Sequence, residues 1–430
     1  MARFLHVADI HLGFDRYNSQ TRSKDFFYAF HDVLQRYAVE AQVDFVVIVG
    51  DLFEHRTIQP STLNQAQICL QLLQQANIPV IAIEGNHDNR PYGTKTSWLR
   101  YLAEWNLLIF LEPGDRGEGE PFLQPWKFER KRGSYIDLDC GVRVIGSYWY
   151  GAMAPQAIEQ MAEAIQGLPP GPSQTMVLFH HGLEGHVSRY AGALRYEEIL
   201  PLRTAGVDYL ALGHIHKSYS VENWVFNPGS IEVNSMEESR YERGAYLVEM
   251  VDGQVVAQLC QDYRQRSLLR LQLKLTGKEL VPDVEAAASD CVQMAIAHHD
   301  LIPADEPIVE LRISGTVGFE PLDLNTKALQ QHLKTLSGAL IFLLRYDVDS
   351  LAYQSPLSES GDRYLIEEEI YQDIVASHAR YQEHTPLLAK GLMALKDSYW
   401  QQQAELQLYE LVGQLLQQTQ ESPQEDSRSS

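Results

Sequence analysis

The first part of the chain alternates short apolar runs with longer stretches of mixed polar and apolar residues. Residues 4–8, 44–49 and 79–83 are apolar runs of strand length, and residues 24–41 and 61–76 between them are long enough for helices. Strands separated by helical crossovers pair in parallel, which is typical of an α/β sheet. Further strands are expected at residues 142–146, 175–179 and 207–212. The pattern therefore predicts an α/β fold.

After residue 220 the pattern changes to short strands separated by glycines. Residues 224–226, 245–249 and 254–258 are the expected strands. A run of strands late in a domain indicates a second sheet packed on the first. We place the end of this first domain at residue 262.

Residues 263–350 repeat the alternation on a smaller scale. Residues 269–275 alternate apolar and polar positions, as a half-buried strand does, and strands at 308–313 and 339–344 follow, separated by helices at 282–298 and 325–336. This β-α-β-α-β order predicts a small α/β domain. Residues 351–430 are expected to hold a Ser-, Pro- and Gly-rich linker at 355–362, amphipathic helices, and a disordered polar tail at 421–430.

Composition narrows the possibilities further. A chain of 430 residues with 45% hydrophobic and 21% charged residues can bury a large core, which excludes a disordered or disulfide-stapled protein. The four cysteines are scattered, and we see neither a signal peptide nor a membrane span, so a cytoplasmic location is expected. A formal net charge of −22 excludes a general polyanion binder.

Chemically active residues follow five of the expected strands directly. In open α/β sheets ligands bind at the carboxyl ends of strands, so these residues are expected to meet at one edge. The five motifs are Asp9-Ile10-His11, Gly50-Asp51, Gly85-Asn86-His87-Asp88, His180-His181-Gly182 and Gly213-His214-Ile215-His216.

These residue types suit a pair of metal ions that act on a phosphoester. Neutral imidazoles bind transition metals, and a carboxylate such as Asp51 can bridge two ions through its two oxygens. Asn86 adds a neutral oxygen where another anion would repel phosphate. Two ions about 3.5–4 Å apart can stabilise both the attacking and the leaving oxygen of a displacement. Each motif alone is a weak signal, and a lone Asp-x-His is usually a surface turn, but the ordered set of five is specific.

The order of motifs resembles the calcineurin-like metallophosphoesterase superfamily. Within that superfamily, residues 8–13 (ADIHLG), 50–53 (GDLF) and 227–230 (NPGS) are similar to the SbcD-type DNA-repair exonucleases. The resemblance covers roughly residues 1–235. It implies a two-sheet sandwich flanked by helices, followed by a small α/β capping domain and a helical region that docks on a partner.

The resemblance also implies a site, carried over residue by residue. One metal would take Asp9, His11, Asp51 and His216, and the other would take Asp51, Asn86, His180 and His214. His180 is preferred to His181 because it directly follows the strand. The two divalent ions are expected to be Mn²⁺, with Mg²⁺, Fe²⁺ or Zn²⁺ as alternatives. His87 would protonate or stabilise the leaving oxygen, and Asp88 would orient it.

Substrate contacts are expected from His55, His181, Arg56 and Arg90. Members of the superfamily often have a histidine three residues past the bridging aspartate, whereas this chain has Glu54 there and His55 next. Either His55 takes that role through a local shift, or the role is absent.

The leading hypothesis is a DNA exonuclease and endonuclease subunit for end processing in double-strand break repair. The resemblance implies DNA and an SbcC-like coiled-coil ATPase as partners, and the sequence leaves a homodimer open. An acidic chain would reach DNA through its metals, through that partner, or through basic clusters at residues 130–132 and 264–270. The alternatives are a small-molecule phosphodiesterase or phosphatase of the same superfamily, and a non-enzymatic scaffold.

Overall fold

The computed structural model describes residues 1–113, 121–186, 192–251, 253–350, 363–376, 381, 384–401 and 403–419. The predicted linker and tail lie outside these residues. Contacts divide the chain into one unit of residues 1–273, 285–313 and 325–346 and another of residues 274–284, 314–324 and 347–430. The domain boundaries expected at residues 262 and 350 stay predictions.

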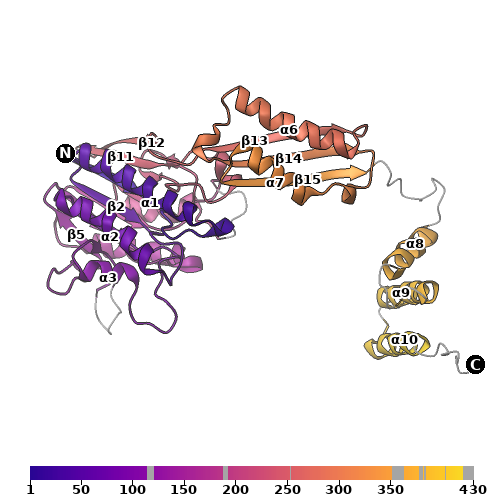
Figure 1. The fold of residues 1–430 in the computed structure, drawn as a ribbon. Coiled ribbons are helices and arrows are strands. Elements are labelled where there is room, and N and C mark those ends of the chain that lie inside the picture. Colours follow the sequence, from indigo (N-terminus) through magenta and orange to yellow (C-terminus); the bar gives the residue numbers. More distant parts are fainter. Residues whose placement is uncertain are drawn as a thin grey trace, which may run out of the picture. The chain divides into compact units, whose positions relative to one another are not determined.

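Two six-stranded mixed sheets form the first part of the chain (Figure 1). In the first sheet, β1, β2, β3 and β4 pair in parallel, and β11 and β12 extend the sheet antiparallel from the free side of β1. Its order is β12 (Gln254–Cys260), β11 (Ala245–Val251), β1 (Ala2–Val7), β2 (Phe45–Val49), β3 (Val80–Ile83) and β4 (Ile109–Phe110).

The second sheet has a parallel centre and antiparallel edges. Strands β6, β7, β8 and β10 pair in parallel, while β5 and β9 pair antiparallel at the two ends. Its order is β5 (Tyr135–Leu138), β6 (Val142–Ile145), β7 (Gln174–Phe179), β8 (Tyr209–Leu212), β10 (Val225–Asn227) and β9 (Tyr219–Val221).

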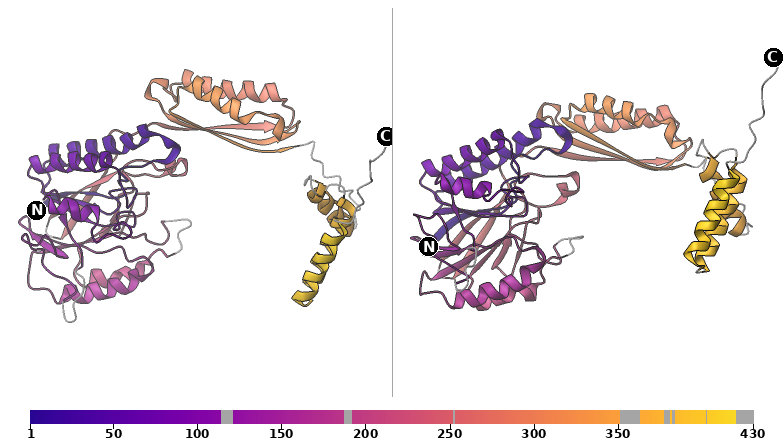
Figure 2. Two further views of the ribbon diagram at one scale, coloured as in Figure 1. Left: turned by 60° about the horizontal axis from the view of Figure 1, so that its bottom comes forward. Right: turned by 90° about the horizontal axis from the view of Figure 1, so that it is seen from below.

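The central strands are apolar on both faces because each sheet is covered twice. In β2, Val47 and Val49 belong to the apolar cluster between the two sheets, whereas Val46 and Ile48 belong to the cluster beneath the helices of the first sheet. Figure 2 shows the sheets between two helical layers. The helices are α1 (Gln20–Leu34, with a π-helical extension Gln35–Glu40), α2 (Pro60–Gln75) and α3 (Trp98–Glu104) on the first sheet, and α4 (Ala154–Gln166) and α5 (Tyr196–Thr204) on the second.

The two-sheet sandwich flanked by helices is confirmed, but one expectation about its construction was wrong. The strands after residue 220 do not form the second sheet by themselves. Strands β11 and β12 complete the first sheet, and β9 and β10 complete the second, whose centre is β6–β8. The apolar pattern identifies a strand, but it does not specify which earlier strand offers an unpaired edge.

The later part of the chain holds a three-stranded sheet and then helices. The sheet has the order β13 (Leu268–Thr276), β14 (Ile308–Val317), β15 (Ile341–Ser350), with α6 (Val281–Ala297) and α7 (Thr326–Ser337) in the connections. Helices α8 (Arg363–Ala376), α9 (Thr385–Trp400) and α10 (Glu405–Gln418) follow. Within the described part of the chain, each helix is too short or too polar to span a membrane.

Candidate metal centre

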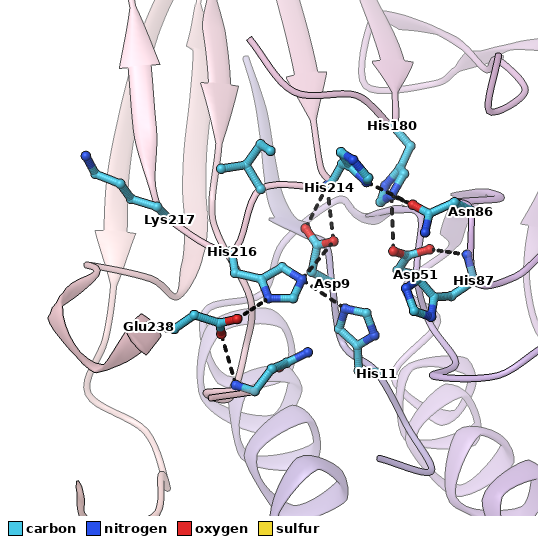
Figure 3. A network of polar contacts seen from close by, with 12 residues as sticks. Asp9, His11, Asp51, Asn86, His87, His180, His214, His216, Lys217 and Glu238 are labelled. Atoms are coloured by element: carbon cyan, nitrogen blue, oxygen red, sulfur yellow. Dashed lines mark hydrogen bonds and ion pairs between the residues drawn. The ribbon is translucent and has the colours of Figure 1, made fainter. Parts of the chain in front are cut away.

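The five motifs converge, but they come from two sheets rather than from one edge. Asp9, Asp51 and Asn86 follow β1, β2 and β3 of the first sheet, and His180 and His214 follow β7 and β8 of the second. Figure 3 shows their side chains gathered where the carboxyl ends of these strands meet. The sandwich therefore joins two half-sites, one from each sheet.

Asp9, His11 and His216 form the first group of potential metal ligands. One ligand atom from each lies within 4.8 Å of the others. The Nε2 atoms of His11 and His216 are 3.2 Å apart, and Asp9 Oδ1 lies 3.9 Å from His216 Nε2. Two nitrogens that share one ion at about 2.0–2.1 Å stand roughly 3.0–3.4 Å apart, so the pair fits a common metal ion.

Asp51, His180 and His214 form the second group, and Asn86 lies against it. His180 Nε2 is 3.2 Å from Asp51 Oδ2, and Asn86 Oδ1 is 2.8 Å from His214 Nδ1. The Nδ1 atom of His180 lies 2.7 Å from the carbonyl oxygen of Val49, which can only accept a hydrogen bond. Nδ1–H therefore donates to Val49, and the Nε2 lone pair of a neutral His180 is left for a metal.

The backbone at these residues is held in an uncommon conformation. Asp9, His11, Asp51 and His214 have φ of 52°, 52°, 54° and 80°, in the left-handed region that costs a residue with a side chain about 1–3 kcal/mol. Gly50 also has a left-handed φ of 81°, and a Cβ there would lie 2.3 Å from His180 Nδ1. Strain concentrated at four of the seven expected ligands is typical of a functional site.

The centre's electrostatics suit cation binding. Burial disfavours a charged His180, but the adjacent Asp51 outweighs it and raises the pKa of His180 to about 9. For His216, burial is likewise outweighed by Glu238, and its pKa is raised to about 9. Burial raises the pKa of Asp51, but His180 and other histidines reverse this and hold the pKa below its usual range. Without metal, His180 and His216 therefore bind protons, and their positive charge balances the nearby carboxylates.

His87 lies beside the first group. Its ring centroid is 5.0 Å from that of His11, and its backbone N–H donates to Asp51 Oδ1 at 2.9 Å. Its Nδ1 is 2.6 Å from the carbonyl oxygen of Glu54, which fixes the orientation of the ring. Nδ1–H therefore donates to Glu54, and His87 keeps Nε2 for an acid or hydrogen-bonding role.

The structure gives no direct contact between the Asp88 carboxylate and the His87 ring, so the expectation that Asp88 orients His87 through such a contact was wrong. The buried Asp88 carboxylate accepts hydrogen bonds from the backbone N–H groups of Leu52, Phe53 and Gly85, at 3.0, 3.0 and 3.3 Å. It ties the loop after β2 to the loop after β3. The Nδ1 atom of His87 instead lies against the Glu54 carbonyl oxygen.

Two carboxylates at the centre were missed as site residues. Glu54 Oε2 lies 2.8 Å from His11 Nδ1, and Glu238 Oε1 lies 3.2 Å from His216 Nδ1. Glu54 was noticed only as a departure from the superfamily pattern. Glu238 lies in the 3₁₀ helix Met236–Arg240, outside every motif, so the sequence offered no signal for it.

The four residues expected to contact substrate differ in how deeply they are buried. His55 does not reach the centre: it is exposed, and its Nε2 lies 3.2 Å from Asp15 Oδ2. His181 is fully buried, with its ring nitrogens 3.1 and 3.2 Å from the carbonyl oxygens of Gly182 and Gly151. Arg56 is half-buried at the centre's border and donates to the Asn86 carbonyl oxygen at 3.4 Å, and Arg90 is exposed.

Two arginines of one expected basic cluster, Arg266 and Arg270, are engaged within the protein, whereas Arg264 is exposed. Arg266 binds the Asp25 carboxylate and the carbonyl oxygens of Asp305 and Glu306, and Arg270 pairs with Glu310 at 3.0 Å. The guanidinium groups of these arginines stabilise the fold and are not available to bind phosphate. In the other cluster, Arg130 is exposed.

The chain is similar to several archaeal proteins named DNA double-strand break repair protein Mre11. It is 31% identical to the one from Archaeoglobus fulgidus over 241 residues, 55% of this chain and 52% of the relative. It is 28% identical to the one from Methanosarcina mazei, over 64% of this chain and 40% of the relative. The match to the Saccharolobus solfataricus protein is 23% identical and covers 85% of this chain and 89% of that one.

The matches to the first two relatives span about half of those proteins or less. The family model for calcineurin-like phosphoesterases matches residues 2–218, which hold both sheets' central strands and the whole of the ligand set. With this match over half its length, the chain belongs to the calcineurin-like phosphoesterase family.

Proposed function

We propose that the chain is a two-metal phosphodiesterase that cleaves DNA, a nuclease subunit of the SbcD type. The observation that carries the proposal is two of the three candidate ligand groups, Asp9–His11–His216 and Asp51–His180–His214, whose residues follow the four strands β1, β2, β7 and β8. Asp51 would bridge the two ions, and Asn86 would complete the second site. Two divalent ions held there would supply the Lewis acidity that activates water and stabilises charge on phosphate.

The protein's own groups would prepare the phosphate for cleavage. Asn86 offers a neutral oxygen and so adds no repulsion to an incoming anion. His87, held by the Glu54 carbonyl oxygen, would keep its Nε2 toward the leaving oxygen and donate a proton or hydrogen bond to it. Half-buried Arg56, which donates to the Asn86 carbonyl oxygen, and exposed Arg90 would contact the backbone of the substrate.

DNA is the substrate class that the relatives favour, because they are named as DNA double-strand break repair proteins. We further propose Mn²⁺ as the metal, because the resemblance to the SbcD type implies it and the carboxylate and amide oxygens of the site suit it. The residues after the two-sheet core also fit this proposal better than a small-molecule phosphodiesterase, which would need no capping domain or helical extension.

An SbcC-like coiled-coil ATPase is the partner that we propose for the C-terminal helices. Helices α9 and α10 line an apolar hollow of about 990 Å³. Large apolar side chains there are exposed, which is typical of a surface that receives a partner helix. They include Tyr399, Trp400 and Tyr409, each at least 68% exposed.

A cleavage assay on defined substrates tests the proposed function. The full chain with Mn²⁺ is expected to degrade linear DNA, and chelation of the metal is expected to abolish the activity. His87→Asn should keep metal binding and lose hydrolysis. Efficient cleavage of cyclic nucleotides without action on DNA would refute the nuclease assignment, and undiminished DNA cleavage by His87→Asn would refute the role of that histidine.

A further inference from the structure

Among the described residues, carboxylates lie against the Nδ1 atoms of the histidines in only one of the two ligand groups. From this placement we infer that Glu54 and Glu238 make the Asp9–His11–His216 group the tighter metal site, so that the two ions bind in separate steps. The inference rests on the proposed function for the presence of two ions. It concerns how this chain supports them.

Glu238 is fixed against His216 by its surroundings. One carboxylate oxygen lies 3.2 Å from His216 Nδ1, and the other accepts the backbone N–H of Asn234 at 3.0 Å. Its side chain is 17% exposed, so water screens the contact only partly. The Nδ1–H of His216 therefore donates to a carboxylate, and Nε2 faces His11.

Glu54 lies against His11, the other histidine of the same group. Its Oε2 is 2.8 Å from His11 Nδ1, an ion-pair contact without hydrogen-bond geometry, and its side chain is 10% exposed. Its backbone N–H donates to the Leu12 carbonyl oxygen at 3.0 Å, which joins the loop after β2 to the loop after β1. The same residue also accepts a hydrogen bond from His87 through its own carbonyl oxygen. The side chain of Glu54 thus supports a ligand, and its main chain supports the expected acid.

The other ligand group is supported by neutral groups. The Nδ1–H of His180 donates to the carbonyl oxygen of Val49 at 2.7 Å. Asn86 contributes an amide oxygen where the first group has the carboxylate of Asp9. Asp51 would serve both ions and does not distinguish them. The difference in negative charge therefore comes from Asp9, Glu54 and Glu238, all on one side.

This asymmetry affects affinity through the basicity of the ligands. An outer partner of a metal-binding histidine fixes its ring and raises its basicity, and loss of such a partner weakens metal binding about 10–100-fold. A carboxylate raises that basicity more than a neutral carbonyl oxygen does, because its full negative charge stabilises positive charge on the imidazole. One site has two such carboxylates, whereas the other has main-chain and amide oxygens. This difference predicts that the sites fill one after the other. The exchangeable ion is the one at Asn86 and His180.

Calorimetric titration of the metal-stripped full chain with Mn²⁺ tests the inference without relying on activity. We expect two separate binding steps, with the tighter one at the Asp9–His11–His216 group. Glu54→Gln and Glu238→Gln should each weaken the tighter step by about 10–100-fold and leave the weaker step in place. Asn86→Ala should remove the weaker step alone.

Glu237→Gln is the matched control, because Glu237 is the immediate neighbour of Glu238 but pairs with Arg345. It removes the same charge from the same 3₁₀ helix and should change neither step. Equal affinities in the wild type, no effect of the two glutamine variants, or loss of the tighter step in Asn86→Ala would each overturn the inference. Two equal sites with DNA cleavage intact would overturn it alone, whereas a chain that binds no Mn²⁺ would overturn the proposed function too.

Discussion

Gly85 is a position where the addition of a single methyl group should damage the centre directly. An alanine Cβ there would lie 2.1 Å from Asp51 Oδ1 and 2.6 Å from the Asp51 backbone nitrogen. Gly85 is not among the residues with a left-handed backbone, so Gly85→Ala is opposed by space alone. The bridging carboxylate would have to retreat to make room.

The size of the effect follows from these distances. An ordinary contact of a Cβ is 3.4–4 Å, so Asp51 must move by more than 1 Å. A displacement of about 1 Å in a catalytic array costs roughly 100-fold in rate, about 2.7 kcal/mol of barrier. Because Asp51 would serve both ions, we also expect both metal-binding steps to weaken.

Steady-state DNA cleavage and Mn²⁺ titration, run side by side on purified Gly85→Ala, measure the two effects. Gly167→Ala is the control, since a Cβ at Gly167 has only ordinary contacts, of 3.6 Å to the Ala164 carbonyl oxygen and 3.9 Å to that of Glu163. It should behave as the wild type in both assays. Cleavage and metal affinity in Gly85→Ala within twofold of the wild type would refute the central position of Asp51.

Two further predictions concern protons. His180 and His216 have their pKa raised to about 9 without metal, and only the neutral ring binds a cation, so metal affinity should rise with pH up to about 9. Titrations in two buffers of different ionisation enthalpy should give different heats, and identical heats would contradict proton release. Burial lowers the pKa of His6 to about 3, so from pH 6.5 downward the unfolded chain takes up a proton that the folded chain refuses. At about pH 4 this lowers the free energy of unfolding by roughly 3 kcal/mol. Urea unfolding measures the effect, and His6→Gln should not lose this part of its stability on acidification. Equal losses in both proteins would show that His6 is not neutral when folded.

The strands that carry the site could be predicted because they are buried on both faces. Residues 45–49, for example, are an unbroken apolar run that lies between the other sheet and a helix layer. Helix α4 was missed although Ile158, Met161 and Ile165 have helical spacing, so the signal was present. Helix α5 has Pro201 inside it and a weak amphipathic pattern, which makes it hard to recognise.

The candidate ligands could be predicted because each one directly follows a strand, where the backbone fixes its place. Side chains that support those ligands could not. Glu238 meets His216 only because the loop after β10 folds back, and Asp88 was assigned to His87 because the two are adjacent in sequence. His6 illustrates the same limit: its ring links β1 to Tyr209 and Leu212 of β8, and so joins the two sheets just beneath the centre. Contacts of this kind depend on how the sheets pack.

Electron paramagnetic resonance of the chain loaded with Mn²⁺ tests the central claim most directly, because it reports how many ions bind and whether they are neighbours. The account predicts two ions per chain, coupled magnetically through a shared Asp51 at about 3.5–4 Å from each other. Asp51→Asn should abolish the coupling. A signal from isolated, uncoupled ions in the wild type, or no bound ion at all, would contradict the two-metal centre.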